Sequence, residues 1–264
     1  MKIRRTGYLW GCLILLAICL QGCASSAERA VQGRHTVVRT VQADIGDSEL
    51  MSLALRGDRA FERLSRFFER SIPTPVYIEI SPGLVISRSF SERGAIAFPV
   101  RVFRRNAAII AHEMTHLFMP ENHWEAFREG IAVYAQDRFG DVVGYPNYGE
   151  DLDKIIARRF LKGVGSGVRT FSEAEAFFRY NRGRNPDNTK VPLSRIDPED
   201  RRNAYLLAGS FTRYVFEVVL GSDMTAFKRI FVQGRFEAVV GTTLSDVETA
   251  WLRKIGADSA KRKL

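Results

Sequence analysis

The sequence predicts an α+β domain with a small mixed sheet near its N-terminus and a mainly helical remainder. Short runs of β-branched or alternating residues lie before residue 100, whereas apolar residues at helical spacing dominate after it. The chain has 264 residues, 45% of them hydrophobic, which is ample for one continuous core. We therefore expect a single domain over residues 35–258, followed by a basic tail over 259–264.

Residues 1–22 have the pattern of an export signal. Basic residues near the start precede an apolar run of about a dozen residues, which is too short to span a bilayer comfortably. The run ends in Leu20-Gln21-Gly22-Cys23, which resembles the lipobox of bacterial lipoproteins. This resemblance implies cleavage before Cys23 and lipidation of Cys23. The next residue is Ala24 and not Asp, which resembles the choice for sorting to the outer membrane.

An uncleaved anchor, or an ordinary signal peptide with an incidental cysteine, is the alternative. Small Gly22 before the cysteine and Leu20 three residues before it fit the lipoprotein pattern and favour lipidation. Cys12 and Cys19 lie inside the signal, so with lipid on Cys23 no thiol remains for a disulfide. Small and polar residues over 23–34 predict a flexible, lipidated tether. We therefore expect a cell-envelope lipoprotein, on the outer membrane and facing the periplasm, held together by its core and a metal.

Three strands and one long helix are expected before residue 100. Residues 35–43, 75–81 and 94–99 predict strands, and residues 48–70 predict an amphipathic helix. The apolar residues spaced for one face of this helix are Leu50, Leu53, Phe61, Leu64 and Phe68.

Residues 106–120 (NAAIIAHEMTHLFMP) predict a short apolar helix that Asn106 can cap and Pro120 ends. His112 and His116 are about one turn apart, so both imidazoles leave the same face. Two imidazoles at this spacing can bind Zn²⁺, and Glu113 is placed to act on a water there. A surface helix that carries two histidines by chance is the alternative, which the apolar neighbours disfavour.

A second helix, over residues 123–139, offers the third ligand. Packed antiparallel to the first helix, it can aim Glu129 at the imidazoles, while Gly130 and Ala132 are small enough for a close approach. Glu125, one turn earlier, is the other candidate, and the small neighbours favour Glu129. Two histidines and one carboxylate leave a fourth position open, as a catalytic zinc site requires.

The competing template HExxHxxGxxH does not fit. Position 119 is Met, position 122 is Asn, and His123 is one residue out of register. His123 is nevertheless the nearest imidazole that could complete a structural zinc site, which needs a fourth protein ligand.

The segments HEMTH, WEAFREGIAVY and AYLLAGSFTRYVFEVVLG together resemble the gluzincin clan of zinc metallopeptidases, in particular the bacterial peptidase-MA-like proteins. Those proteins share HExxH, a downstream W-x-x-x-EG-x-A-x-Y helix and a later helix that contains Tyr. The resemblance covers roughly residues 75–255 and departs at Trp124, which lies one place further from Glu129 than in the pattern.

This resemblance implies a zincin-like peptidase fold. It implies that His112, His116 and Glu129 bind zinc and that Glu113 is the general base. It also implies that an edge strand pairs with the substrate, so that Ala95–Phe98 would form the upper wall of the cleft. A strand inside the sheet is the alternative for these residues.

A tyrosine near the metal could steady the oxyanion formed during peptide hydrolysis. The helix expected over about 198–220 carries Tyr205 and Tyr214, and the place of Tyr205 in the gluzincin-like helix favours it. A core tyrosine with its hydroxyl at the rim is the alternative. Residues 181–200 are rich in Asn, Pro, Arg and Asp, which favours a mobile loop beside the cleft.

The remaining expected elements are four helices and a link: helices over 151–163, 171–180, 224–234 and 244–257, and a flexible link over 163–168.

The net charge of +9 falls to +6 without the signal, and neither this charge nor the scattered arginines indicate nucleic-acid binding. The expected function is a membrane-anchored zinc metallopeptidase that acts on a peptide or protein of the cell envelope. No motif that grasps a free N-terminus is visible, which favours an endopeptidase. The alternative is a non-catalytic binding or assembly lipoprotein that keeps the peptidase fold.

Overall fold

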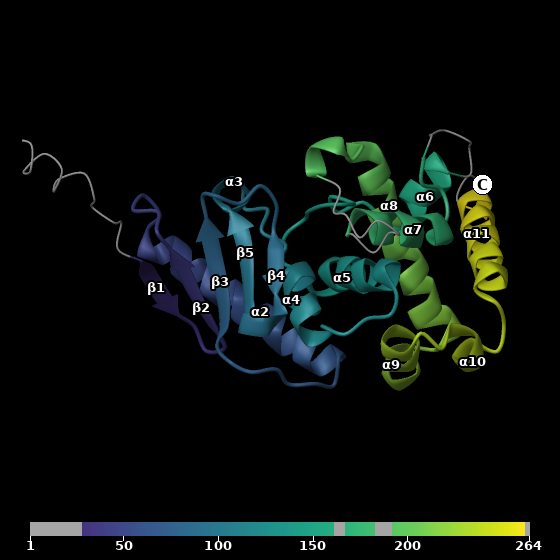
Figure 1. Ribbon diagram of the computed structural model, residues 1–264, viewed down its shortest axis with the longest axis horizontal. Helices are drawn as coiled ribbons and strands as arrows, with labels where there is room; N and C mark the ends of the chain where they lie inside the picture. Colours follow the sequence, from purple (N-terminus) through teal and green to yellow (C-terminus); the bar gives the residue numbers. More distant parts are fainter. Residues whose placement is uncertain (1–27, 161–166, 183–191, 262–264) are drawn as a thin grey trace, which may run out of the picture.

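The computed structural model describes residues 28–160, 167–182 and 192–261, and it has the expected α+β architecture. In Figure 1 a sheet lies towards one end of the longest axis and α11 (Leu244–Lys261) lies at the other end. The signal, Cys23, residues 163–166 of the expected link and residues 183–191 of the expected loop lie outside the described residues. Within the described ranges, no helix is both long and apolar enough to cross a membrane.

The sheet has five strands in the order β1-β2-β3-β5-β4. The two outer pairs are antiparallel and the two inner pairs are parallel, so the sheet is mixed. The strands are β1 (Arg29–Gln32), β2 (Thr36–Thr40), β3 (Val76–Ser81), β4 (Arg88–Phe90) and β5 (Ala95–Pro99). The three strands expected from the sequence are confirmed as β2, β3 and β5.

The tether expected over 23–34 is wrong for residues 29–32, which form β1. This strand pairs with β2 from Arg29 opposite Thr40 to Gln32 opposite Val37, and Val31 packs against the core. Small and polar composition does not exclude an edge strand, because such a strand needs only backbone pairing on one side.

The expectation that Ala95–Phe98 form an edge strand is also wrong. Strand β5 lies between β3 and β4, and every residue in it is buried, so the sheet-core alternative holds. The edge strand next to β5 is β4, a three-residue strand with Arg88 exposed. So short a strand gives too few residues for a periodic pattern, and the sequence did not reveal it.

Helix α2 (Asp47–Phe67) packs against β1, β2 and α4. The five residues expected on its apolar face are all buried. The side chain of Arg56 on this helix binds three partners: Asp141 (2.8 Å), the side chain of Asn106 (2.8 Å) and the carbonyl of Ala108 (3.0 Å). Helix α2 therefore fixes the segment that leads into α4.

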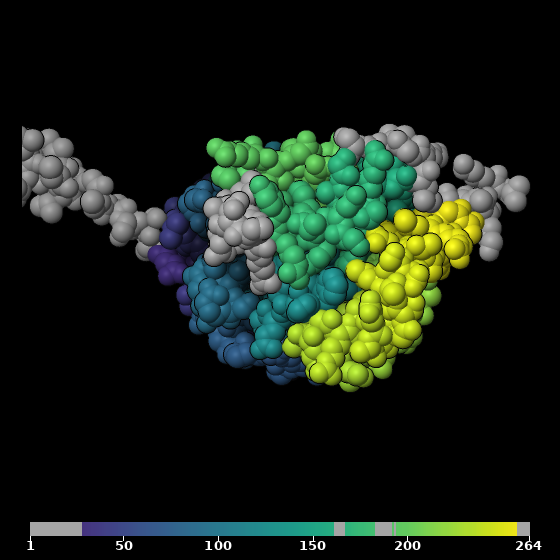
Figure 2. All heavy atoms as spheres, turned by 45° about the vertical axis from the view of Figure 1, so that its right-hand side comes forward, coloured from purple at the N-terminus to yellow at the C-terminus, as the bar shows by residue number. Residues whose placement is uncertain are grey.

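The helical part is built around α8 (Pro198–Tyr214), which continues into a π-helical turn over Val215–Val219 and packs on α5, α6 and α7. Asp197 caps its start and Pro198 occupies the first turn. Other helices are α3 (Val100–Arg104), α4 (Ile110–Phe118), α5 (Glu125–Phe139), α6 (Leu152–Arg159), α7 (Phe171–Asn181), α9 (Met224–Gln233) and α10 (Phe236–Val240). Figure 2 shows α9 to α11 wrapping one side of this part.

Candidate metal centre

Helix α4 carries both histidines, and its start is held by another helix. The expectation that Asn106 caps it is wrong, because the helix begins at Ile110 and the side chain of Asn106 binds Arg56. The backbone N–H of His112 instead donates to Oε1 of Gln136 at 3.2 Å, from α5. A side chain from a neighbouring helix thus satisfies one of the free N–H groups of the first turn.

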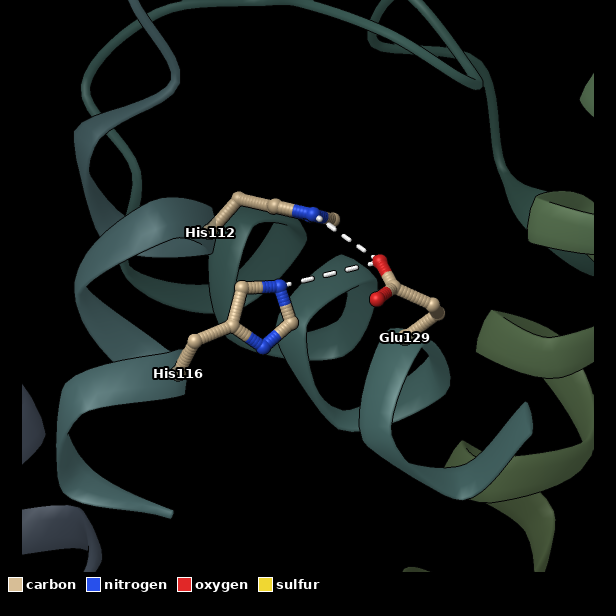
Figure 3. A group of neighbouring side chains, drawn as sticks. All are labelled: His112, His116 and Glu129. Carbon is tan, nitrogen blue, oxygen red and sulfur yellow. Dashed lines mark ion pairs between the residues drawn. The ribbon is translucent and has the colours of Figure 1, made fainter. Parts of the chain in front are cut away.

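The side chains of His112, His116 and Glu129 converge between α4 and α5 (Figure 3). Oε2 of Glu129 lies 3.5 Å from Nε2 of His112 and 3.6 Å from Nε2 of His116. All three residues are buried, with at most 4% of their surface exposed. The structure therefore brings together the three ligands expected from the sequence.

This group could hold a metal ion, and its chemistry suits zinc. Two ligand atoms about 2.1 Å from a tetrahedral zinc lie about 3.4 Å apart, close to the two distances measured here. Two imidazoles and a carboxylate are also a usual donor set for a zinc ion with an open position. Neither Nδ1 has a hydrogen-bond partner among the described residues, so packing holds the two rings in place.

His123 is not part of this group. Its backbone N–H donates to Phe231 at 2.8 Å, and its ring packs against Gly234, on the side of α9. Among the described residues, the atoms able to share one metal come from the three residues above. The structure therefore offers no support for His123 as a fourth ligand.

The expectation that Gly130 lets α5 approach α4 closely is wrong, although Glu129 is the residue that faces the histidines. A Cβ on Gly130 would lie 2.1 Å from Oγ1 of Thr212 and 2.4 Å from the carbonyl oxygen of Ala208. Both atoms belong to α8, so Gly130 permits close packing of α5 on α8 and not on α4. The small size of Gly130 therefore does not explain why Glu129 faces the imidazoles.

Glu125 has a different role from Glu129. It is fully buried, and its carboxylate lies 2.7 Å from Nη1 of Arg182 and 3.8 Å from Nη1 of Arg128. Arg182 also donates to Oε1 of Glu129, so one guanidinium joins the two acidic residues. Nothing in the sequence indicated Arg182, which is 53 residues from Glu129 and comes just after α7.

The buried ion cluster shifts the pKa of each ligand. Burial alone would raise the pKa of Glu129, but the charges and hydrogen bonds of His116 and His112 hold it well below its usual range. Burial lowers the pKa of His116. For His112, burial is outweighed by the hydrogen bond with Glu129 and by the charge of Glu113, so its pKa is raised. Glu129 is therefore ionised, as a metal ligand must be.

Glu113 lies beside the ligands and lines the cleft, with 7% of its surface exposed. Burial raises the pKa of its carboxyl group to about 7, against the lowering effect of His112. A carboxyl group with a pKa near neutrality is suited to accept and return a proton.

Tyr205 also lies at the site. Its ring centroid is 6.1 Å from that of His112 and 5.3 Å from that of Tyr145, and both tyrosines line the cleft. Burial raises the pKa of Tyr205, so its hydroxyl remains a hydrogen-bond donor. Tyr214 is not among the cleft residues. The sequence did not single out Tyr145, whose hydroxyl is buried without a hydrogen-bond partner in the described part of the chain.

The metal-binding group opens into a cleft of about 790 Å³. One wall is the segment from Val85 to Phe90, which includes β4, and the other is formed by residues of α5, α8 and the turn around Tyr145. Oγ of Ser91 donates to the carbonyl of His116 at 3.3 Å, which ties α4 to the sheet wall. The arrangement places buried donor atoms, a carboxyl group and a phenol around one cavity that is large enough for part of a peptide.

No protein-family model matches this sequence. No curated protein matches it either. Among solved structures, the chain is similar to native yeast LTA4 hydrolase, with a TM-score of 0.44 and 12% sequence identity. The similarity covers 87% of this chain but 38% of that one. A likeness at this level assigns neither a family nor an activity, so function must be inferred from the site.

Proposed function

We propose that the chain is a zinc-dependent peptidase. The observation that carries the proposal is the position of Glu113, a buried carboxyl group with a pKa near 7, beside His112, His116 and Glu129 in one cleft. The resemblance of the HEMTH and WEAFREGIAVY segments to gluzincins supports the same reaction.

In the proposed reaction, His112, His116 and Glu129 hold the metal. When bound, Zn²⁺ supplies a Lewis acid that polarises the scissile carbonyl and makes water easier to deprotonate. Glu113 takes the proton from the attacking water and passes it to the leaving amine. The hydroxyl of Tyr205 donates a hydrogen bond to the oxyanion that develops on the carbonyl.

The proposal also includes the place of the enzyme. Lipid on Cys23 would anchor the chain to the outer membrane, and its substrate would be a peptide or protein of the cell envelope. The lipobox-like Leu20-Gln21-Gly22-Cys23 supports this part of the proposal. A Cys23→Ser variant should then lose its acyl mass and leave the membrane fraction, whereas an acyl-free parent would contradict it.

The test of the activity is hydrolysis of casein and labelled peptides by the full chain in detergent, with zinc content measured in parallel. We expect Glu113→Gln to keep its zinc and to lose at least about a hundredfold in rate. Glu121→Gln removes the same charge from an exposed position outside the cleft and should behave as the parent does. If the parent binds one zinc and cuts none of these substrates, the alternative of a non-catalytic binding lipoprotein is favoured.

A further inference from the structure

The cleft carries more positive charge than its own carboxylates neutralise. Its charged lining consists of Arg88, Arg101, Arg128, Arg182, Arg201, Glu113, Glu125 and Glu129. Arg128 and Arg182 lie within 4 Å of Glu125. The other three arginines have no carboxylate within that distance in the described part of the chain. A bound Zn²⁺ would make the cleft still more positive, so its electrostatics favour an anionic ligand.

Arg201 is the one of these three that lies beside the reactive groups. Its guanidinium carbon is 5.7 Å from the ring centroid of Tyr145 and 5.9 Å from that of Tyr205. The two rings meet edge to face, and together they hold a partly buried cation that has no anionic partner among the described residues. A guanidinium held in this way can offer parallel N–H groups to a carboxylate.

The distances place this cation close to the reaction centre. The ring centroid of Tyr205 lies 5.9 Å from the guanidinium carbon of Arg201 and 6.1 Å from the ring centroid of His112. An extended peptide advances about 3.3 Å per residue, so a ligand of Arg201 belongs to a residue within roughly three positions of the scissile bond.

We propose that Arg201 binds a carboxylate of the substrate within about three residues of the scissile bond, and that the cleft therefore selects peptides that carry a carboxylate at that distance. This inference rests on the proposed peptidase function and names its substrate class. Arg88 on β4 and Arg101 on α3 line the opposite wall, where both are exposed and attract the same charge from solvent. The carboxylate is either an acidic side chain or the C-terminus of the peptide.

Two sets of fluorescein-labelled dodecapeptides of Ala and Leu distinguish these sources. The first set carries a single Glu, or Gln as its isostere, at each central position of a C-terminally amidated peptide. The peptides of the second set carry Gln and no Glu at the central positions, and their C-terminus is either a free acid or an amide. Cleavage is measured with the full-length zinc-loaded chain. Binding is measured separately, by fluorescence anisotropy on Glu113→Gln, which is expected to bind without cutting.

We expect at least about a tenfold preference for the carboxylate over its neutral counterpart in one of the two sets. Arg201→Gln should reduce this preference to near one, and Arg201→Lys should retain part of it, because a point charge replaces a two-pronged donor. Arg229→Gln is the matched control, since this exposed arginine on α9 lies outside the cleft. The control should keep the full preference.

The two readouts separate this inference from the proposed function. The absence of a carboxylate preference in both peptide sets, or a preference that survives in Arg201→Gln, would overturn the inference and leave the peptidase intact. A carboxylate preference in binding that Arg201→Gln removes, without cleavage by the parent, would support the inference and count against the peptidase. A preference for the free acid over the amide would identify the C-terminus as the source, and a preference for internal Glu would identify a side chain.

Discussion

The partly buried Arg182 and the buried Glu129 form an ion pair in which Arg182 binds one carboxylate oxygen while the other faces the two imidazoles. The second branch of the same guanidinium lies 2.7 Å from Glu125. Two glutamates one turn apart on α5 therefore have separate tasks, because Glu129 faces the metal position and Glu125 holds the arginine that orients it. Replacement of a group that orients a metal ligand typically lowers metal affinity by about 10- to 100-fold.

Replacement of Arg182 by Leu should weaken zinc binding by about 10- to 100-fold, since Glu129 would lose the hydrogen bond that fixes its carboxylate. Zinc affinity is measured by competition with a fluorescent chelator. Arg179→Leu is the control, because Arg179 lies one turn earlier and binds Glu175 and the carbonyl of His123 instead. Equal zinc affinity in the parent and in Arg182→Leu would show that packing alone orients Glu129.

We expect Glu129→Gln to lower zinc affinity and Glu125→Gln to lower mainly the free energy of unfolding. The first variant removes a ligand charge and should lose at least about a hundredfold in zinc affinity. The second leaves the ligands in place, so its zinc affinity should stay within about tenfold of that of the parent. Its free energy of unfolding should fall by about 1–3 kcal/mol, because Arg182 and Arg128 lose a buried partner. Zinc affinity is measured by chelator competition and the free energy of unfolding by urea unfolding. A larger loss of zinc affinity in Glu125→Gln than in Glu129→Gln would identify Glu125 as the ligand.

Zinc should raise the thermal midpoint of unfolding, because its ligands join α4 to α5. At about 100 times the dissociation constant the stabilisation is about 2.7 kcal/mol, or roughly 5–10 °C for a domain of this size. The midpoint is measured with zinc and with EDTA for each protein. The midpoint of His116→Ala should be the same with zinc and with EDTA, whereas the midpoint of His123→Ala should still be higher with zinc. If zinc no longer raised the midpoint of His123→Ala, a structural zinc site with His123 as its fourth ligand would be favoured.

Gly130→Ala should destabilise the fold. Alanine gains up to about 1 kcal/mol in helix propensity, but the new methyl group would meet the backbone oxygen of Ala208, which cannot swing aside. Overpacking of this kind costs about 1–3 kcal/mol, so we expect the clash to win and the midpoint to fall by several degrees. Gly83→Ala is the control, because nothing lies within 4 Å of its Cβ position. Unchanged stability in Gly130→Ala would mean that α5 and α8 can move apart at little cost.

Features that depend on local spacing could be predicted from the sequence. His112 and His116 are four residues apart on one helix, so the sequence alone predicts that they lie on one face with Glu113 beside them. Strands β2, β3 and β5 are long enough to show a residue pattern. The apolar face of α2 was predictable for the same reason. The proximity of Glu129 to the histidines was also foreseen, because α5 follows α4 after a short connection.

Features that depend on pairing between distant segments could not be predicted in the same way. The side chain of Gln136 caps α4, Gly130 faces α8, and Arg182 reaches α5 from the segment after α7. Each contact depends on how two helices pack against each other. The residues next to it in the sequence do not indicate which distant segment it will meet. The position of β5 inside the sheet likewise depends on β4, which is too short to be recognised from its composition.

Strand β1 limits how far the proposed enzyme could travel from a membrane. It begins at Arg29, and a fully extended chain covers roughly 20 Å in the six steps from Cys23. With lipid on Cys23, the sheet end of the domain would stay within that distance of the bilayer surface. The cleft would then meet substrates by a two-dimensional search along the membrane, and proteins held at the same surface would be encountered far more often than freely diffusing ones.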